Sequence, residues 1–94
     1  MSLIIRTRKT GGVVFFDLVG NLTKGDAIAQ VRDAIQSRMN DGDLQFVVDV
    51  RNVSWIDDYG LEELMRARRT INEQGGDLKL INFDPPTGLP LKFN

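Results

Sequence analysis

The chain has 94 residues, with 12 basic and 13 acidic side chains and neither cysteine nor histidine. Without cysteine the chain has no disulfides or thiolate nucleophiles, and without histidine it lacks the commonest general base and metal ligand. The near-zero net charge argues against nucleic acid or an anionic membrane as partner. No apolar run reaches the roughly 20 residues of a membrane span. We therefore expect a single cytoplasmic, non-enzymatic domain over residues 1–94, with no cofactor and no metal ion.

The first two predicted elements are strands joined by a tight turn. Residues 3–9 and 13–19 are rich in β-branched or aromatic side chains, and Thr10, Gly11 and Gly12 separate them. Glycine accepts the positive backbone angles that a hairpin turn requires. We therefore expect the sheet to begin with an antiparallel hairpin.

A loop and a helix are predicted next. The segment 20–26, GNLTKGD, has the composition of a loop in which Thr23 or Asp26 caps the following helix. Gly42 stands where a left-handed residue commonly ends a helix. The apolar residues between these points recur at helical spacing and are Ile28, Val31, Ala34, Ile35 and Met39.

A strand and a loop are predicted to precede a second helix. Residues 44–50, LQFVVDV, alternate little, which is typical of a strand covered on both faces or nearly so. Residues 51–58, RNVSWIDD, predict a loop. The apolar stripe of the following helix consists of Leu61, Leu64, Met65, Ala67 and Ile71. Its other face is expected to carry Glu62, Glu63, Arg66, Arg69 and Glu73, with Glu62 and Arg66 spaced for an ion pair.

The last predicted strand completes an α/β pattern. Gly75 and Gly76 are expected to end the second helix, and residues 77–83, DLKLINF, alternate as a strand. The order β-β-α-β-α-β contains two strand–helix–strand units, which imply parallel neighbours. The predicted fold is therefore a small mixed β-sheet, led by a β-hairpin, with helices packed on it.

An ordered set of motifs runs through the second half of the chain. A strand containing Asp49 leads into Val-x-Trp-Ile-Asp-Asp-x-Gly-Leu at 53–61, and a helix, Gly75-Gly76 and a Leu-x-Leu-x-Asn strand follow. This set, with the GNLTKGD segment, resembles the STAS domain, the fold of bacterial anti-sigma factor antagonists, most strongly over residues 11–83. That family normally continues with another helix, whereas residues 84–94, DPPTGLPLKFN, contain prolines that disfavour one. We expect the C-terminal helix to be absent or truncated.

The acidic pair Asp57-Asp58 is the main candidate site. Either aspartate is suited to cap the second helix, and Gly60 would keep side-chain bulk away from the turn. The resemblance implies that Asp58 occupies the position of a regulatory serine, which a serine kinase that also acts as anti-sigma factor phosphorylates. Aspartate cannot form that phosphoserine, which carries about −1.5 to −2 charges, but keeps a permanent negative charge. Asp58 then either locks a state like the phosphorylated one or suits a different partner with a basic pocket.

The resemblance also implies a partner-binding surface formed by the GNLTKGD segment, the WIDDYG segment and the exposed face of the second helix. Tyr59, if exposed, would be an interface anchor, and its alternative is packing against the sheet edge. Trp55 is interpreted as a core or rim residue. The candidate contacts are Asn21, Thr23, Lys24, Tyr59, Glu62, Glu63 and Arg66.

Four functions are considered from these features. The first is a protein-interaction domain like an anti-sigma factor antagonist, which binds an anti-sigma factor of the serine-kinase type. The alternative is a STAS-fold scaffold or a subunit of a larger signalling or transport assembly. A small-molecule or nucleotide-binding module, or a phospho-aspartate receiver, fits less well, because there is no phosphate-binding glycine run and the acidic pair comes from one segment. A missing helix would uncover apolar sheet, so we also expect self-association or association with another chain.

Overall fold

The computed structural model describes residues 3–83. Its elements are β1 (Ile4–Thr10), β2 (Val13–Leu22), α1 (Asp26–Asn40), β3 (Gln45–Ile56), α2 (Asp58–Glu73) and β4 (Asp77–Ile81). The strands form one sheet in the order β1-β2-β3-β4, in which β1 is antiparallel to β2 and the β2–β3 and β3–β4 pairs are parallel. The predicted element order and the mixed α/β sheet are confirmed. The expected lack of a C-terminal helix concerns residues 84–94, which lie outside the described residues.

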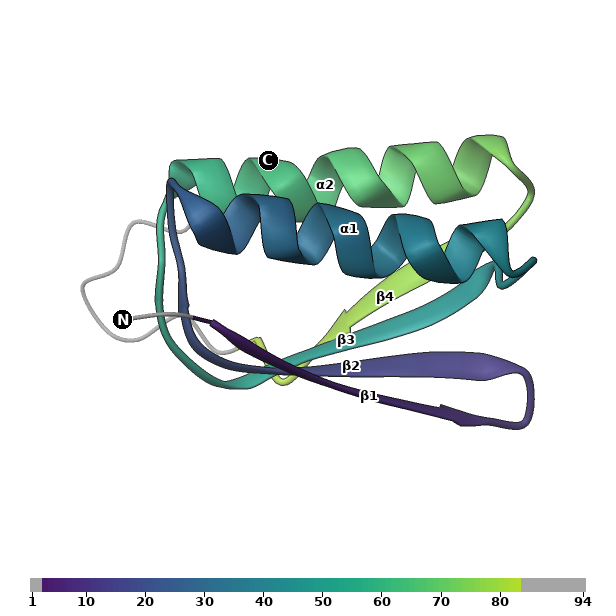
Figure 1. The fold of residues 1–94 in the computed structure, drawn as a ribbon, viewed down its shortest axis with the longest axis horizontal. Coiled ribbons are helices and arrows are strands. Elements are labelled where there is room, and N and C mark those ends of the chain that lie inside the picture. The colour runs from purple at the N-terminus through teal and green to yellow at the C-terminus, as the bar shows by residue number, and fades with distance from the viewer. Residues whose placement is uncertain (1–2, 84–94) are drawn as a thin grey trace.

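Both helices lie side by side on one face of the sheet, as Figure 1 shows. The strands therefore alternate between buried residues under the helices and more accessible residues on the opposite face. Phe16 and Phe46 stack in the core with their ring centroids 5.9 Å apart. β3 was expected to be covered on both faces or nearly so; its first half instead alternates between buried and half-buried residues, with Val47 and Asp49 half-buried.

The two central strands extend beyond their predicted ends. β2 continues to Leu22 and β3 to Ile56, so much of the predicted loops 20–26 and 51–58 is strand. The two extensions pair with each other, Leu22 with Ile56, after shifts of register that follow Asp17 and Gly20. Both paired side chains are buried. Pairing between segments distant in sequence thus overrides the polar, loop-like composition of each.

Both helices end at the glycines predicted from the sequence, but the N-terminus of α1 is not capped as predicted. Gly25 is the N-cap of α1 and no side chain caps this end, so the expected capping by Thr23 or Asp26 is wrong. Gly42 has φ of 93° and donates its N–H to the Met39 carbonyl at 2.9 Å, which ends α1 as expected. Gly75, with φ of 90°, follows α2 in the same way.

Neither helix in the range 3–83 combines the length and the hydrophobicity that a membrane crossing requires.

Candidate functional site

Asp57 joins the start of α2 to the connection between β2 and α1. It is the N-cap of α2 in an extended conformation, with φ of −100°. One carboxylate oxygen, Oδ1, accepts the N–H of Gly60 at 2.8 Å, and Oδ2 accepts the N–H of Lys24 at 2.9 Å. A single side chain thus satisfies a free helix N–H and fixes a segment 33 residues away in sequence.

Gly60 allows α2 to start directly against β2. A Cβ atom at this position would overlap the backbone oxygen of Leu22 and lie 2.9 Å from Leu22 Cγ. The same Leu22 oxygen accepts the N–H of Asp57 at 3.3 Å. The close approach of helix and strand therefore requires a residue without a side chain at position 60.

Asp58 occupies the first turn of α2 and is exposed. Its side chain has no hydrogen bond or ion pair within the described residues 3–83. A carboxylate at this end of a helix interacts favourably with the helix dipole. Because Asp57 already provides the cap, the Asp58 carboxylate is free to meet a partner.

Two exposed aromatic side chains flank this carboxylate. Tyr59 is 56% exposed and Trp55 is 50% exposed, so Trp55 is not a core residue. Lys24 Nζ lies 5.1 Å from the centroid of the Tyr59 ring, a cation–π distance. Asn21 is the register partner of Trp55 in β2, and both Asn21 and Thr23 are half-buried. The fold thus brings the GNLTKGD segment beside the WIDDYG segment.

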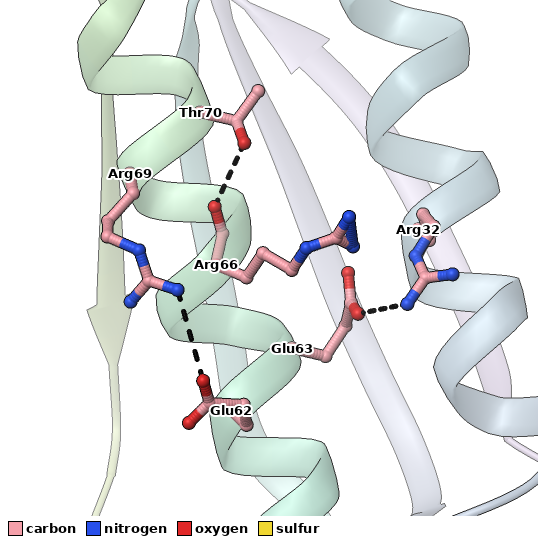
Figure 2. A network of polar contacts seen from close by, with 6 residues as sticks. All are labelled: Arg32, Glu62, Glu63, Arg66, Arg69 and Thr70. Atoms are coloured by element: carbon pink, nitrogen blue, oxygen red, sulfur yellow. Dashed lines mark hydrogen bonds and ion pairs between the residues drawn. The ribbon is translucent and has the colours of Figure 1, made fainter.

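The exposed side of α2 carries Glu62, Arg66 and Arg69, all drawn in Figure 2. The expected ion pair between Glu62 and Arg66 is not formed; Arg69 Nη2 lies 3.9 Å from Glu62 Oε1 instead. The Arg66 side chain extends towards α1, while its carbonyl accepts the Thr70 hydroxyl at 3.1 Å.

Glu63 is the one candidate that the structure removes from the exposed surface. Its side chain is 5% exposed and faces α1, where Arg32 Nη2 donates to Glu63 Oε1 at 2.8 Å (Figure 2). The hydrogen bond and the negative charge of Glu63 raise the pKa of Arg32. The expectation of a solvent-facing Glu63 was wrong because α1 covers this side of α2. No pattern in the sequence pairs residues 32 and 63.

The arrangement as a whole is suited to protein contact. Asp58, Tyr59, Trp55, Lys24 and Glu62 are all exposed, and we call this set the β3–α2 surface. Interface hot spots favour aromatic anchors of this kind. Among residues 3–83 no group of three or more acidic side chains is gathered as a metal site would need.

Comparison with known proteins adds the family. The family model of the STAS domain matches residues 5–88. The structure is similar to that of the anti-sigma factor antagonist SpoIIAA of Bacillus in its unphosphorylated form, with a TM-score of 0.74, 21% identity and coverage of 87% of this chain and 76% of SpoIIAA. An anti-sigma factor antagonist from Mycobacterium paratuberculosis gives a TM-score of 0.76 at 19% identity, covering 90% of this chain and 71% of that one.

A further similar structure is larger. The protein Mglu gives a TM-score of 0.72 at 23% identity, and the match covers 89% of this chain but 20% of Mglu. At such identities these likenesses establish the fold. No functionally curated protein matches the chain.

Proposed function

Because this chain belongs to the STAS domain family, we propose that it is a non-enzymatic protein-interaction domain of the anti-sigma-factor-antagonist type. Its partner would be an anti-sigma factor of the serine-kinase class, which it would meet in the cytoplasm. The observation that carries this proposal is the exposed carboxylate of Asp58 at the first turn of α2, which has no hydrogen bond or ion pair within residues 3–83.

The surroundings of Asp58 support a binding role. Asp57 caps the helix on its own, so the helix does not need a second aspartate for that purpose. Tyr59 and Trp55 expose half or more of their surface beside Asp58, although large apolar side chains are usually withdrawn from water. The candidate contacts are now Asn21, Thr23, Lys24, Tyr59, Glu62 and Arg66; Glu63 supports α2 from within and is not one of them.

The charge at position 58 determines the mode of regulation. SpoIIAA occurs in an unphosphorylated and a phosphorylated form. A phosphoserine carries about −1.5 to −2 charges at neutral pH, and a carboxylate carries −1 without any kinase. We propose that Asp58 holds this domain permanently in a state like the phosphorylated one, so that its affinity for a kinase-type partner is low.

The test exchanges the carboxylate for a hydroxyl. Wild type and Asp58→Ser are used as baits in extract of the source cell, and captured proteins are quantified by mass spectrometry. We expect Asp58→Ser to enrich a kinase-type anti-sigma factor about tenfold or more over wild type, equivalent to about 1.4 kcal/mol of binding free energy. Asp58→Asn tests removal of the charge alone, and Asp33→Ser on the exposed side of α1 is the matched control.

Two results would contradict the proposal. If Asp58→Ser and Asp33→Ser capture the same proteins in equal amounts, position 58 has no regulatory role. If wild type binds a kinase-type partner more tightly than Asp58→Ser, the carboxylate is recognised by a basic pocket rather than acting as a mimic of phosphate.

The second candidate function is a scaffold within a larger assembly. It is favoured by one observation, that the same fold forms a fifth of the Mglu chain and so also occurs as a part of a larger protein. A scaffold would retain its partner whatever residue occupies position 58. Equal capture of one abundant partner by all four baits would therefore support this candidate.

A further inference from the structure

One face of the sheet is covered by neither helix. Figure 1 shows α1 and α2 together on the opposite side. The register places Arg6 of β1 opposite Asp17 of β2, Asp17 beside Asp49 of β3, and Asp49 beside Ile81 of β4. These four side chains form one row across the uncovered face, because residues in register point to the same side of a sheet.

A second row lies next to the first. It contains Arg8, Phe15, Val47 and Lys79 in the same strand order. Arg8 stacks over the Phe15 ring, with its guanidinium carbon 4.1 Å from the ring centroid. Between the rows is a hollow of about 240 Å³, lined by residues that include Arg6, Arg8, Phe15, Asp17, Asp49 and Ile81.

This face is apolar as well as charged. Ile81 is 38% exposed, and Ile4, which lies opposite Val19 at the end of β1, is 53% exposed. Phe15, Val19 and Val47 are half-buried. Exposed apolar groups gathered on one face usually mark a surface that another protein covers.

The charges on this face are separated but not paired with each other. Arg6 lies opposite Asp17, yet no ion pair joins them, and the buried Oδ1 of Asp17 accepts no hydrogen bond within residues 3–83. Asp49 is occupied differently: its Oδ1 accepts the N–H of Arg51 at 2.9 Å and the side-chain amide of Asn82 at 3.0 Å. Within residues 3–83, Arg6 and Arg8 on the edge strand β1 form no ion pair, and the centre of the sheet carries two carboxylates, of which Asp17 has a buried oxygen without a hydrogen bond.

We propose that this uncovered face is the interface of a homodimer. A two-fold axis that runs along the strands, midway between β1 and β2, places β1 of each copy over β2 of the other. Arg6 of each copy then lies opposite Asp17 of its partner, and Arg8 lies opposite Phe15, as an isologous interface requires. Packed sheets lie about 10 Å apart, a gap that an arginine and an aspartate bridge together.

A second copy fits this face better than an unrelated chain does. A partner of uniformly acidic or uniformly basic character would match only one half of the charge pattern, and would oppose the other half. A copy of the same face supplies both signs in the required places. The inference does not depend on the proposed function, because it uses none of the residues of the β3–α2 surface.

The experiment measures association of the full chain by sedimentation equilibrium. Wild type is expected to dimerise, and the double variant Arg6→Glu/Arg8→Glu and the single variant Asp17→Lys are each expected to raise the dissociation constant about tenfold or more. An equimolar mixture of these two variants is expected to associate more tightly than either variant alone, because the reversed charge at position 6 of one then meets the reversed charge at position 17 of the other, and the unchanged Arg6 meets the unchanged Asp17. Salt at about 1 M should weaken the wild-type dimer, since charge attraction is screened.

Controls separate association from folding. Arg69→Glu reverses an exposed charge on α2, away from the uncovered face, and is expected to change the dissociation constant less than twofold. Circular dichroism checks that each variant is folded, and Asp17→Asn replaces Asp17→Lys if the lysine disrupts the sheet. Asp17→Asn should then weaken association, and mixing it with the arginine double variant should recover only part of the affinity, because one of the two Arg6–Asp17 contacts is restored.

Two outcomes would overturn the proposal. A wild-type chain that is monomeric at about 200 μM has no such interface at that concentration. A dimer whose dissociation constant is insensitive to Arg6, Arg8 and Asp17 uses another surface. If wild type is monomeric, carbodiimide labelling of Asp17 shows what covers this face. Protection of Asp17 would mean that another segment of the same chain covers it, and reactivity of Asp17 would mean that the face is open to a different protein.

Discussion

At the scale of single residues, Asp57 does more than its position in the sequence implied. Its position before the helix predicts a cap. The structure adds a hydrogen bond from the Lys24 backbone N–H, which no local sequence pattern predicts. Gly60 is similar: the sequence suggested that a small residue suits the turn, and the close approach of Leu22 explains why only glycine fits. Asp58 differs from both, because its side chain has no hydrogen bond or ion pair within residues 3–83 and interacts with the fold only through the dipole of α2.

Replacing Asp57 tests this division between the two aspartates. Asp57→Ala removes the acceptor of two backbone N–H groups, and we expect the free energy of unfolding to fall by about 1–2 kcal/mol. Asp57→Asn should lose about half as much, since its one amide oxygen can still cap the helix but its NH2 group cannot accept the N–H of Lys24. Urea unfolding followed by circular dichroism measures the difference. Equal stability of Asp57→Ala and wild type would show that the cap contributes nothing.

At the scale of elements, the contact between α1 and α2 depends on a polar pair. Arg32 donates to Glu63 at 2.8 Å, with 52% of the arginine side chain and 5% of the glutamate side chain exposed. A buried carboxylate without a partner is costly, whereas an exposed guanidinium without a partner is hydrated. Loss of Arg32 therefore leaves a buried carboxylate without a partner, whereas loss of Glu63 leaves only a guanidinium that water can hydrate.

This inequality predicts an order of stability. Arg32→Met leaves Glu63 buried and unpaired, and we expect it to destabilise the fold at least twice as much as Glu63→Met, which leaves Arg32 in water. The double variant should be no less stable than Arg32→Met alone, because it contains no unpaired carboxylate. Thermal unfolding of the four proteins measures these differences. The reverse order of the two single variants would show that packing of the methionine, rather than the lost pair, controls the outcome.

The strand ends also belong to this scale. Residues 20–22 and 51–56 look like loop because they are polar and contain glycine or asparagine. They become strand because each supplies the hydrogen-bonding partner of the other across β2 and β3. Such pairing depends on the position of a second segment, so sequence patterns within one segment predict it poorly.

At the scale of the whole molecule, acid stability should depend on Asp49. Burial alone would raise the pKa of Asp49, but hydrogen bonds from Arg51 and Asn82 and the charges of Arg51 and Arg8 outweigh it and hold the pKa below its ordinary value. A carboxylate with a lowered pKa in the folded state stabilises the fold fully above its unfolded pKa, about 3.9. This stabilisation disappears as the pH falls through the lower pKa of the folded state.

The prediction is a pH-dependent gap between wild type and Asp49→Asn. We expect wild type to be more stable at pH 7 and the gap to narrow steadily below about pH 4. Urea unfolding at a series of pH values measures it, and Asp41→Asn controls for the loss of one exposed carboxylate. A gap that stays constant down to about pH 2 would mean that the ionised form of Asp49 has no advantage in the folded protein.

Local patterns in the sequence were enough to establish the order of elements, the α/β class, the glycine-ended helices and the acidic turn before α2. Each of these depends on neighbours within about one turn of helix or one strand, where spacing and backbone preference act directly. Three features required the folded chain: the joined ends of β2 and β3, the burial of Glu63 against Arg32, and the sheet face that no helix within residues 3–83 covers. Each arises from contact between segments far apart in sequence, and such contacts exist only once the helices and strands have been placed.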